Sequence, residues 1–131
     1  MADMSNYLEN KLLDLTLKGT AYAGFDRPYV SLHTSDPTDA GTAGTEVTGG
    51  SYARTRVTMA AAAGTTGSVA STADVTFPTA TAAFGTVGWI GLWDNASGGN
   101  MLYHTALDAA KTIDTGDVFK IVTGNLTVTL A

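Results

Sequence analysis

The sequence predicts a mainly β protein, folded as a single antiparallel β-sandwich or jelly-roll domain with one N-terminal α-helix. About seven or eight short runs of alternating or apolar residues follow one another, roughly 8 to 15 residues apart, from about residue 28 to residue 130. No helical pattern separates these runs, which argues against βαβ units. The chain of 131 residues has the usual size of one domain, and no change of composition divides residues 1–131.

The first expected element is a helix over about residues 5–18. Ser5 or Asn6 can cap its N-terminus, and Glu9 follows Asn6 at the spacing of a capping box. Gly19 stands where a C-terminal glycine belongs. Five leucines form an apolar stripe on this segment: Leu8, Leu12, Leu13, Leu15 and Leu17. We therefore expect one helix face to dock, either on the chain's own sheet, which is favoured, or on a neighbouring subunit.

The next segments read as strands separated by turns. Residues 29–34 alternate and stop at the turn residues Ser35, Asp36 and Pro37, after which residues 36–51 form a long loop. Further strands are expected over residues 52–59, 69–77, 113–115, 118–122 and 126–130. Residues 86–93 and the return strand 101–106 are predicted to form a hairpin with a longer connection.

The most apolar strand carries large side chains on both faces. By simple alternation Trp89 and Trp93 share one face with Val87, while Ile90 and Leu92 share the other. Such a strand is expected at the centre of a sheet or at a subunit contact. For the two tryptophans, a place in the core is favoured over an exposed platform for sugars.

The charge balance argues against a nucleic-acid partner. Seven Lys and Arg stand against twelve Asp and Glu, and Arg54 and Arg56 are a close basic pair besides the expected helix lysines. Charged residues make up 15% of the chain, and interface cores are likewise depleted in Lys, Glu and Asp. This composition suits a protein whose exterior meets other subunits, although secreted β proteins share it.

Membrane and thiol chemistry are not expected. The longest apolar run, Met59 to Ala63, is far shorter than the ~20 residues of a membrane-spanning helix. The first residues lack the basic start and apolar stretch of a signal peptide. The chain has no cysteine, which excludes disulfides, thiol nucleophiles and thiolate metal sites.

The sequence predicts no catalytic residues, no cofactor and no metal. His33 and His104 each fall in an expected strand without a second ligand at i+2 or i+4, and hydrogen bonding within the sheet is favoured for both. No Gly-x-Ser-x-Gly motif is present. Two acidic groups resemble loose calcium loops but fit turn chemistry better: Asp36, Asp39 and Glu46, and Asp114 with Asp117.

Several stretches together resemble a known family. They are residues 5–13, 32–38, 50–54, 89–94 and 113–119. In their order and spacing, these stretches resemble a family of small tailed-bacteriophage proteins that are commonly labelled tail fibre proteins. They also look like the small jelly-roll cement or decoration proteins of phage heads. The resemblance implies a virion structural protein, present in many copies, that needs no enzyme site.

Three functions from different classes follow, with the first favoured. The first is a head cement protein on the outer surface of the phage head, a homotrimer that binds the major capsid protein; the absence of a repetitive shaft favours it. The second is a tail-fibre or tail-tip adaptor that contacts the host, and the third is a secreted carbohydrate-binding module. Residues expected at a partner interface are Tyr7, Leu8, Leu12, Arg54, Arg56, Trp89 and Trp93.

Overall fold

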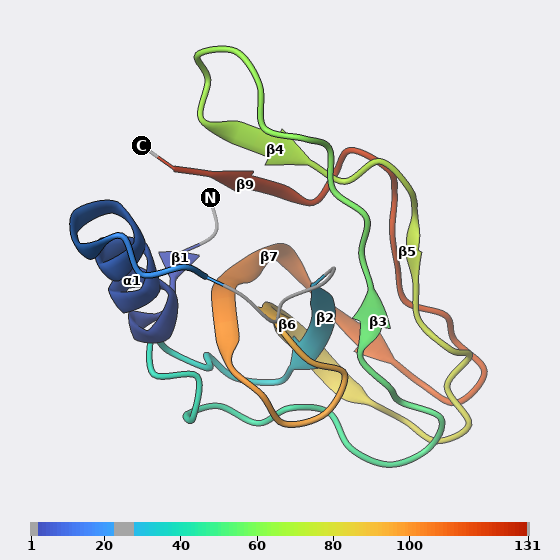
Figure 1. Ribbon diagram of the computed structural model, residues 1–131. Helices are drawn as coiled ribbons and strands as arrows, with labels where there is room; N and C mark the ends of the chain where they lie inside the picture. Colours follow the sequence, from blue (N-terminus) through green and yellow to red (C-terminus); the bar gives the residue numbers. More distant parts are fainter. Residues whose placement is uncertain (1–2, 23–27, 131) are drawn as a thin grey trace.

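The computed structural model describes residues 3–22 and 28–130, which form one helical segment and nine strands (Figure 1). The helical segment consists of α1 (Asn6–Leu13) and a π-helical turn, η1 (Asp14–Lys18). The strands are β1 (Asp3–Met4), β2 (Tyr29–His33), β3 (Thr55–Arg56), β4 (Ser68–Ala70), β5 (Val75–Thr76), β6 (Gly85–Trp93), β7 (Met101–Ile113), β8 (Lys120–Ile121) and β9 (Thr127–Thr129). The predicted mainly β class with one helix is confirmed.

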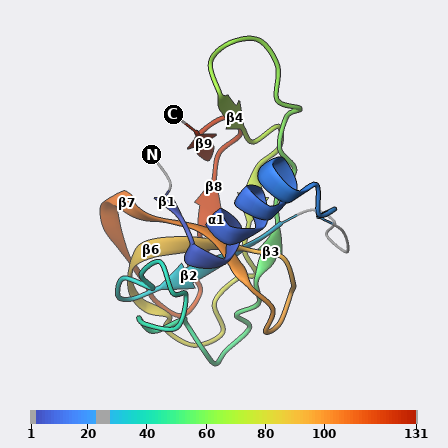
Figure 2. The same ribbon diagram turned by 60° about the vertical axis from the view of Figure 1, so that its left-hand side comes forward.

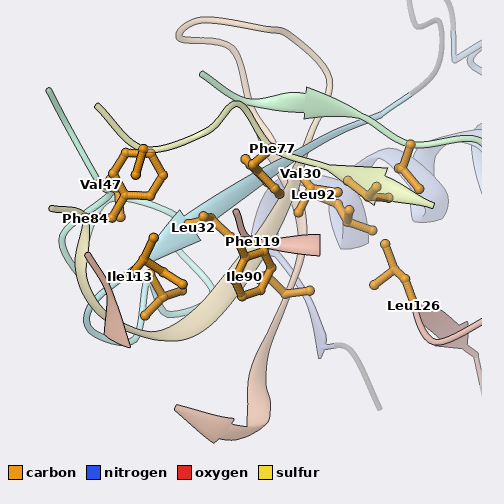
Figure 3. Close-up of a cluster of buried hydrophobic side chains, with 14 residues drawn as sticks. Val30, Leu32, Val47, Phe77, Phe84, Ile90, Leu92, Ile113, Phe119 and Leu126 are labelled. Atoms are coloured by element: carbon orange, nitrogen blue, oxygen red, sulfur yellow. The ribbon is translucent and has the colours of Figure 1, made fainter. Parts of the chain in front are cut away.

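The strands form one large antiparallel sheet and two ribbons. The sheet has the order β1-β7-β6-β2-β3, and the ribbons pair β4 with β9 and β5 with β8. Apolar side chains from both parts meet in one buried cluster, in which Phe77 lies beside Val30 and Leu92 (Figure 3). This arrangement is consistent with the predicted β-sandwich.

The N-terminus of α1 is held by Ser5. Its Oγ accepts a hydrogen bond from the backbone N of Leu8 at 3.3 Å and donates one to the carbonyl oxygen of Met101. The backbone N of Ser5 donates to the carbonyl of Leu102 at 2.9 Å, so the cap also ties the helix to β7. Of the two predicted caps, Ser5 is therefore the one used.

The C-terminal half of the helical segment differs from the expected α-helix. Gly19 ends it with φ +72°, as predicted, but residues from Asp14 to Lys18 form a π-helical turn. A π turn holds more residues than an α turn and rotates the apolar stripe off its expected direction. The predicted docking on the chain's own sheet therefore holds for the buried Leu8, whereas Leu13, Leu15 and Leu17 are 54%, 41% and 77% exposed.

Several strand boundaries differ from the prediction. β7 continues to Ile113, so the separate strand expected at 113–115 is wrong. The strand expected over 52–59 is reduced to β3, and the one over 69–77 is divided into β4 and β5. The division lies at residues 71–74, where Asp74 accepts hydrogen bonds of 2.8 Å from the backbone N and Oγ1 of Thr123 and the chain passes between ribbons.

Strand β6 lies centrally, between β7 and β2, as predicted. The prediction that Val87 shares a face with Trp89 is wrong. The register with β7 shifts between Val87 and Trp89, where the single residue Gly88 lies opposite residues 107–110 of β7, an irregularity of the β-bulge type. A bulge exchanges the faces on its two sides. Val87 therefore points into the same core as Ile90, while Trp89 lies on the opposite face.

One connection projects from the body of the fold. Between β3 and β4 the chain forms the light green loop of Figure 1, and residues 61–67 are all exposed. Seen from the side, this loop stands at one end of the molecule (Figure 2). Within residues 3–22 and 28–130, no helix is long and apolar enough to span a membrane.

Candidate functional site

A buried polar cluster lies on the face of the sheet opposite the main core. Along β2, Val30 and Leu32 point into the core, and Ser31 and His33 alternate onto the other face. Both polar residues are buried, with Ser31 at 0% and His33 at 3% exposure. Strand β2, which contributes Ser31 and His33 to the polar cluster, is therefore buried on both faces.

Ser31 is the centre of the hydrogen bonds in this cluster. Its Oγ accepts from Nε1 of Trp93 at 2.8 Å and bonds Nε2 of His33 at 2.7 Å. Gly91 lies directly between these groups, since a Cβ at this position would stand 2.8 Å from Ser31 Oγ and 2.9 Å from Trp93 Nε1. Glycine at this strand position is thus explained by close approach of side chains.

The pair of Ser31 and His33 has the hydrogen bond of a nucleophile and its base, but the remaining features do not suit catalysis. Ser31 is fully buried, and Trp93 occupies its hydroxyl as well. Nδ1 of His33 has no hydrogen-bond partner among the described residues, whereas a catalytic base is normally oriented by a third group. Burial lowers the pKa of His33, and the charge of Arg54 acts in the same direction, although Glu46 opposes them.

Arg54 closes the cluster at one side. Its Nε and Nη2 donate to the two carboxylate oxygens of Glu46 at 2.9 and 2.8 Å, and its guanidinium lies 3.8 Å from the ring centre of Trp93. Nη1 donates to the carbonyl oxygens of Asn95 and Gly98, at 3.2 and 2.8 Å. Arg54 thereby fastens the β6–β7 connection and the loop that carries Glu46 to the sheet.

Glu46 is also bound by Tyr52. The hydroxyl of Tyr52 donates to Glu46 Oε2 at 2.6 Å and accepts from the backbone N of Leu32 at 3.1 Å. Burial alone would raise the pKa of Glu46, but the hydrogen bonds from Arg54 and Tyr52 outweigh it and hold the pKa below its ordinary value. Burial and the bond to Glu46 raise the pKa of Tyr52.

His104 holds the other end of the long loop. Its Nε2 lies 2.8 Å from Oδ1 of Asp39, and its Nδ1 lies 3.7 Å from Asp36 Oδ1. The backbone N of Asn6 donates to the carbonyl of Asp39 at 2.9 Å, so the same loop contacts the start of α1. Both histidines are buried strand residues, and His33 is hydrogen-bonded within the sheet as predicted, whereas His104 is bonded to Asp39 of the loop.

The acidic side chains of the two groups form the hydrogen bonds to backbone N–H groups that are typical of turns. Asp36 Oδ1 accepts from the backbone N of Thr38 at 2.8 Å, and Asp117 Oδ2 accepts from that of Asp114 at 2.9 Å. Across the described ranges 3–22 and 28–130, no group of three His, Cys, Asp or Glu side chains could hold a metal ion.

The interface residues predicted on the helix occupy different environments. Leu8 is buried by the chain itself, and Tyr7 and Leu12 are half-buried. Lys11 Nζ lies 5.6 Å from the ring centre of Tyr7. Tyr7 also neighbours Tyr22, whose pKa is raised to about 12 by burial and by Tyr7. Tyr7 and Leu12 are thus the predicted helix residues that remain partly accessible.

The interface residues predicted on the strands also occupy different environments. Arg54 and Trp93 are engaged in the polar cluster, and the side chain of Arg54 is 8% exposed. Trp89 is half-buried, and Arg56 is exposed with its guanidinium 5.4 Å from the ring centre of Tyr29. The structure therefore brings Arg54 and Trp93 together with Trp89 on one sheet face, while their role in binding a partner stays a prediction.

Two accessible apolar surfaces were not among the predicted interface residues. The first, called here the leucine surface, consists of Leu13 and Leu17, which lie four residues apart on the same side of the helical segment; the leucine stripe pointed to it, but the π turn that exposes it has no sequence signature. The second is a groove of about 730 Å³ between β7 and residues 117–127. Val118 and Val122, each 48% exposed, line this groove.

Comparison with known proteins identifies the family. A family model described as "Podophage GP4 fiber I protein gp80" matches residues 3–129. The chain belongs to this family. The resemblance to small tailed-phage virion proteins is thereby confirmed, and the chain is a structural protein of the phage virion. No curated protein matches it.

Proposed function

We propose that this chain is a non-enzymatic subunit of a phage tail fibre, which attaches the fibre through contacts with a neighbouring virion protein and with other copies of itself. The observation that carries this proposal is the family match, which spans residues 3–129 and whose description names a fibre protein. The absence of a repetitive fibre shaft from the sequence favours head cement. A compact adaptor at the end of a fibre also needs no shaft, and the family description supports the fibre role.

The buried polar cluster supports a structural role. Ser31 and His33 are 0% and 3% exposed, so no substrate reaches them without rearrangement of the sheet. The hydrogen bonds of Ser31 and His33 lie within the sheet, and beside them Arg54 bonds Glu46 of the loop of residues 34–51 and Gly98 of the β6–β7 connection. We infer that the part of the cluster formed by Arg54, Glu46 and Tyr52 fixes the shape of these loops, since hydrogen-bonded buried networks are rigid.

The leucine surface is our candidate for contact with the neighbouring virion protein. Monomeric proteins seldom expose leucines as a group, and Leu17 is 77% exposed. Tyr7 and Leu12 lie on the same helical segment and are partly accessible. Lys11 and Lys18 are exposed on this segment too, so the accessible apolar side chains have charged neighbours, as in the polar rim of a binding surface.

The copy number in purified particles tests the proposal. A fibre subunit is expected at about three to eighteen copies per virion by quantitative gel, because tails have threefold and sixfold symmetry. Antibody labelling in the electron microscope is then expected at the tail. Hundreds of copies, with label over the head, would overturn the fibre assignment and support the cement role instead.

A further inference from the structure

The imidazole of His33 lacks one of the hydrogen bonds that its protonated form needs. Its Nε2 bonds Ser31 Oγ at 2.7 Å, and that hydroxyl also accepts from Nε1 of Trp93. Its Nδ1 is buried and has no hydrogen-bond partner within residues 3–22 and 28–130. A neutral imidazole carries one ring proton, which Nε2 can donate to Ser31, whereas an imidazolium carries two. The second proton would lie on Nδ1, without an acceptor.

The charged groups around His33 come from three segments of the chain. Arg54 and His104 disfavour a positive charge on the ring, and Glu46 favours it. The carboxylate of Glu46, however, already accepts hydrogen bonds from Nε and Nη2 of Arg54 and from the hydroxyl of Tyr52. A charged His33 therefore stays without a partner as long as this arrangement holds, and an unpaired buried charge is costly.

The segment that contains Glu46 is joined to β2 by a short backbone bridge. Glu46 forms an isolated antiparallel bridge with His33, and beside it the backbone N of Val47 donates to the carbonyl of Leu32 at 2.9 Å. On its other edge, β2 pairs with β6 along its whole length. Separation of residues 45–47 from β2 therefore breaks fewer bonds than separation of β2 from β6, and local opening follows the weaker contact.

The histidine at the other end of the same loop has a different environment. Nδ1 of His104 also lacks a hydrogen-bond partner in the described part of the chain, but it lies 3.7 Å from Oδ1 of Asp36. Its Nε2 lies 2.8 Å from Oδ1 of Asp39. A second proton on this ring would face a carboxylate. Acid therefore does not oppose the contact between His104 and the loop.

We propose that the loop of residues 34–51 opens at one end in acid: protonation of His33 separates residues 45–47 from β2, while Asp36 and Asp39 stay attached to His104. In the open form water reaches the imidazole, which then binds a proton at its ordinary pKa of ~6.5. In the closed form, burial and the charge of Arg54 lower the pKa of His33. Each pH unit below about 6.5 therefore raises the ratio of open to closed chains by up to tenfold. The proposed structural role thereby gains a response to acid.

Amide hydrogen exchange followed by NMR between pH 7 and pH 5 tests this opening. Protection factors, which correct for the intrinsic effect of pH on exchange, should fall at Val47 by up to tenfold per pH unit below about 6.5. The amide of Asn6 donates to the carbonyl of Asp39 and should keep its protection. Glu46 stays ionised in this range, because its hydrogen bonds outweigh burial and hold its pKa below the ordinary value.

Two variants separate the contributions of the histidines. His33→Gln removes the titrating group and should make the protection at Val47 independent of pH. His104→Gln keeps His33 and should preserve the fall at Val47. Equal falls at Val47 and Asn6, no fall at Val47 in the wild type, or an unchanged fall in His33→Gln would each overturn the proposal. The first two results come from the wild-type chain and need no variant to fold, and all three leave the fibre assignment to copy number and particle labelling.

Discussion

Strand β2 of the central sheet is buried on both faces, but the two faces are built from different chemistry. On the core face, Val30 and Leu32 pack against aromatic rings from the ribbons, among them Phe77. On the opposite face, the intervening residues Ser31 and His33 join a network of hydrogen bonds. Successive residues of β2 are thus buried in two different ways, by apolar packing and by hydrogen bonding.

The two faces contribute differently to the stability of the fold and to the position of its loops. Apolar burial stabilises roughly in proportion to area and has little directionality. A buried polar network contributes less net free energy but requires particular partners at particular distances. In this chain the core face therefore supplies most of the stability, and the polar face determines where the loops lie.

Truncation in the apolar core should have the largest effect on stability. Phe77 is 1% exposed and packs on Tyr52 and Phe119, with ring centres 6.3 and 5.7 Å away. Phe77→Ala should lower the free energy of unfolding by about 3–5 kcal/mol, measured by urea denaturation. Phe77→Leu retains most of the volume and should cost less than half as much. A loss under about 1 kcal/mol for Phe77→Ala would contradict the assignment of stability to this face.

Removal of the arginine from the polar face should have the next largest effect. Arg54→Met leaves Glu46 without its bidentate partner and removes the charge from the Trp93 ring, for an expected loss of about 2–4 kcal/mol in urea denaturation. Adding Glu46→Gln should recover part of this loss, because an unpaired amide costs less than an unpaired carboxylate.

Arg56→Met is the matched control for that variant. Arg56 is an exposed arginine two residues away along the chain, and its removal should change stability by about 0.5 kcal/mol or less. Equal losses for the two arginine variants would contradict the difference in burial between them.

A smaller effect should appear in the pH dependence of stability. Burial lowers the pKa of His33 in the folded state, with further lowering by Arg54 and His104, whereas the unfolded histidine titrates near its ordinary ~6.5. The unfolded state therefore binds more protons. The contribution of His33 to stability is complete above about pH 6.5 and is lost as the pH falls from there through the lower folded pKa.

His33→Gln should consequently flatten the fall in stability between about pH 7 and pH 5, followed by urea denaturation at each pH. Ser31→Ala is the control, since it removes a hydrogen bond of His33 but keeps the titrating group. That control should reduce stability without flattening the curve. Identical pH profiles for His33→Gln and the wild type would exclude His33 as the source.

The smallest effect on stability is expected at the leucine surface. Leu17→Glu should change the free energy of unfolding by about 0.5 kcal/mol or less, because the side chain is 77% exposed. It should nevertheless reduce incorporation into particles, measured by complementation of a deletion phage and gel quantification. Thr16→Glu adds the same charge at the neighbouring exposed position and should be incorporated normally. Equal incorporation of both variants would contradict a contact at this surface.

The sequence predicted those elements whose residues alternate cleanly. β2 and the β6–β7 hairpin were found because their apolar residues and turn residues agree. The continuation of β7 was missed because residues 107–112 are rich in Ala, Asp and Lys, which are depleted in strands. Pairing with β6 overrides that preference at both ends of the segment.

The candidate site was harder to predict, for two physical reasons. Arg54 was expected at an exposed interface, since an arginine is rarely buried without partners, and those partners come from Glu46 and from the distant Asn95 and Gly98. Gly88 gave no sign of a bulge, so alternation placed Val87 on the wrong face. Both cases depend on contacts between segments that are far apart in the sequence.

The projecting loop between β3 and β4 offers a place to add foreign sequence. Residues 61–67 are exposed, and the closest tethers hold the base of the loop, where Ala60 N bonds Ala70 O and Leu130 N bonds Gly67 O. Loop tips of small residues accept insertions because no buried backbone hydrogen bond is lost. A short peptide placed after Gly64 would therefore project from the body of the fold without disturbing the sheet.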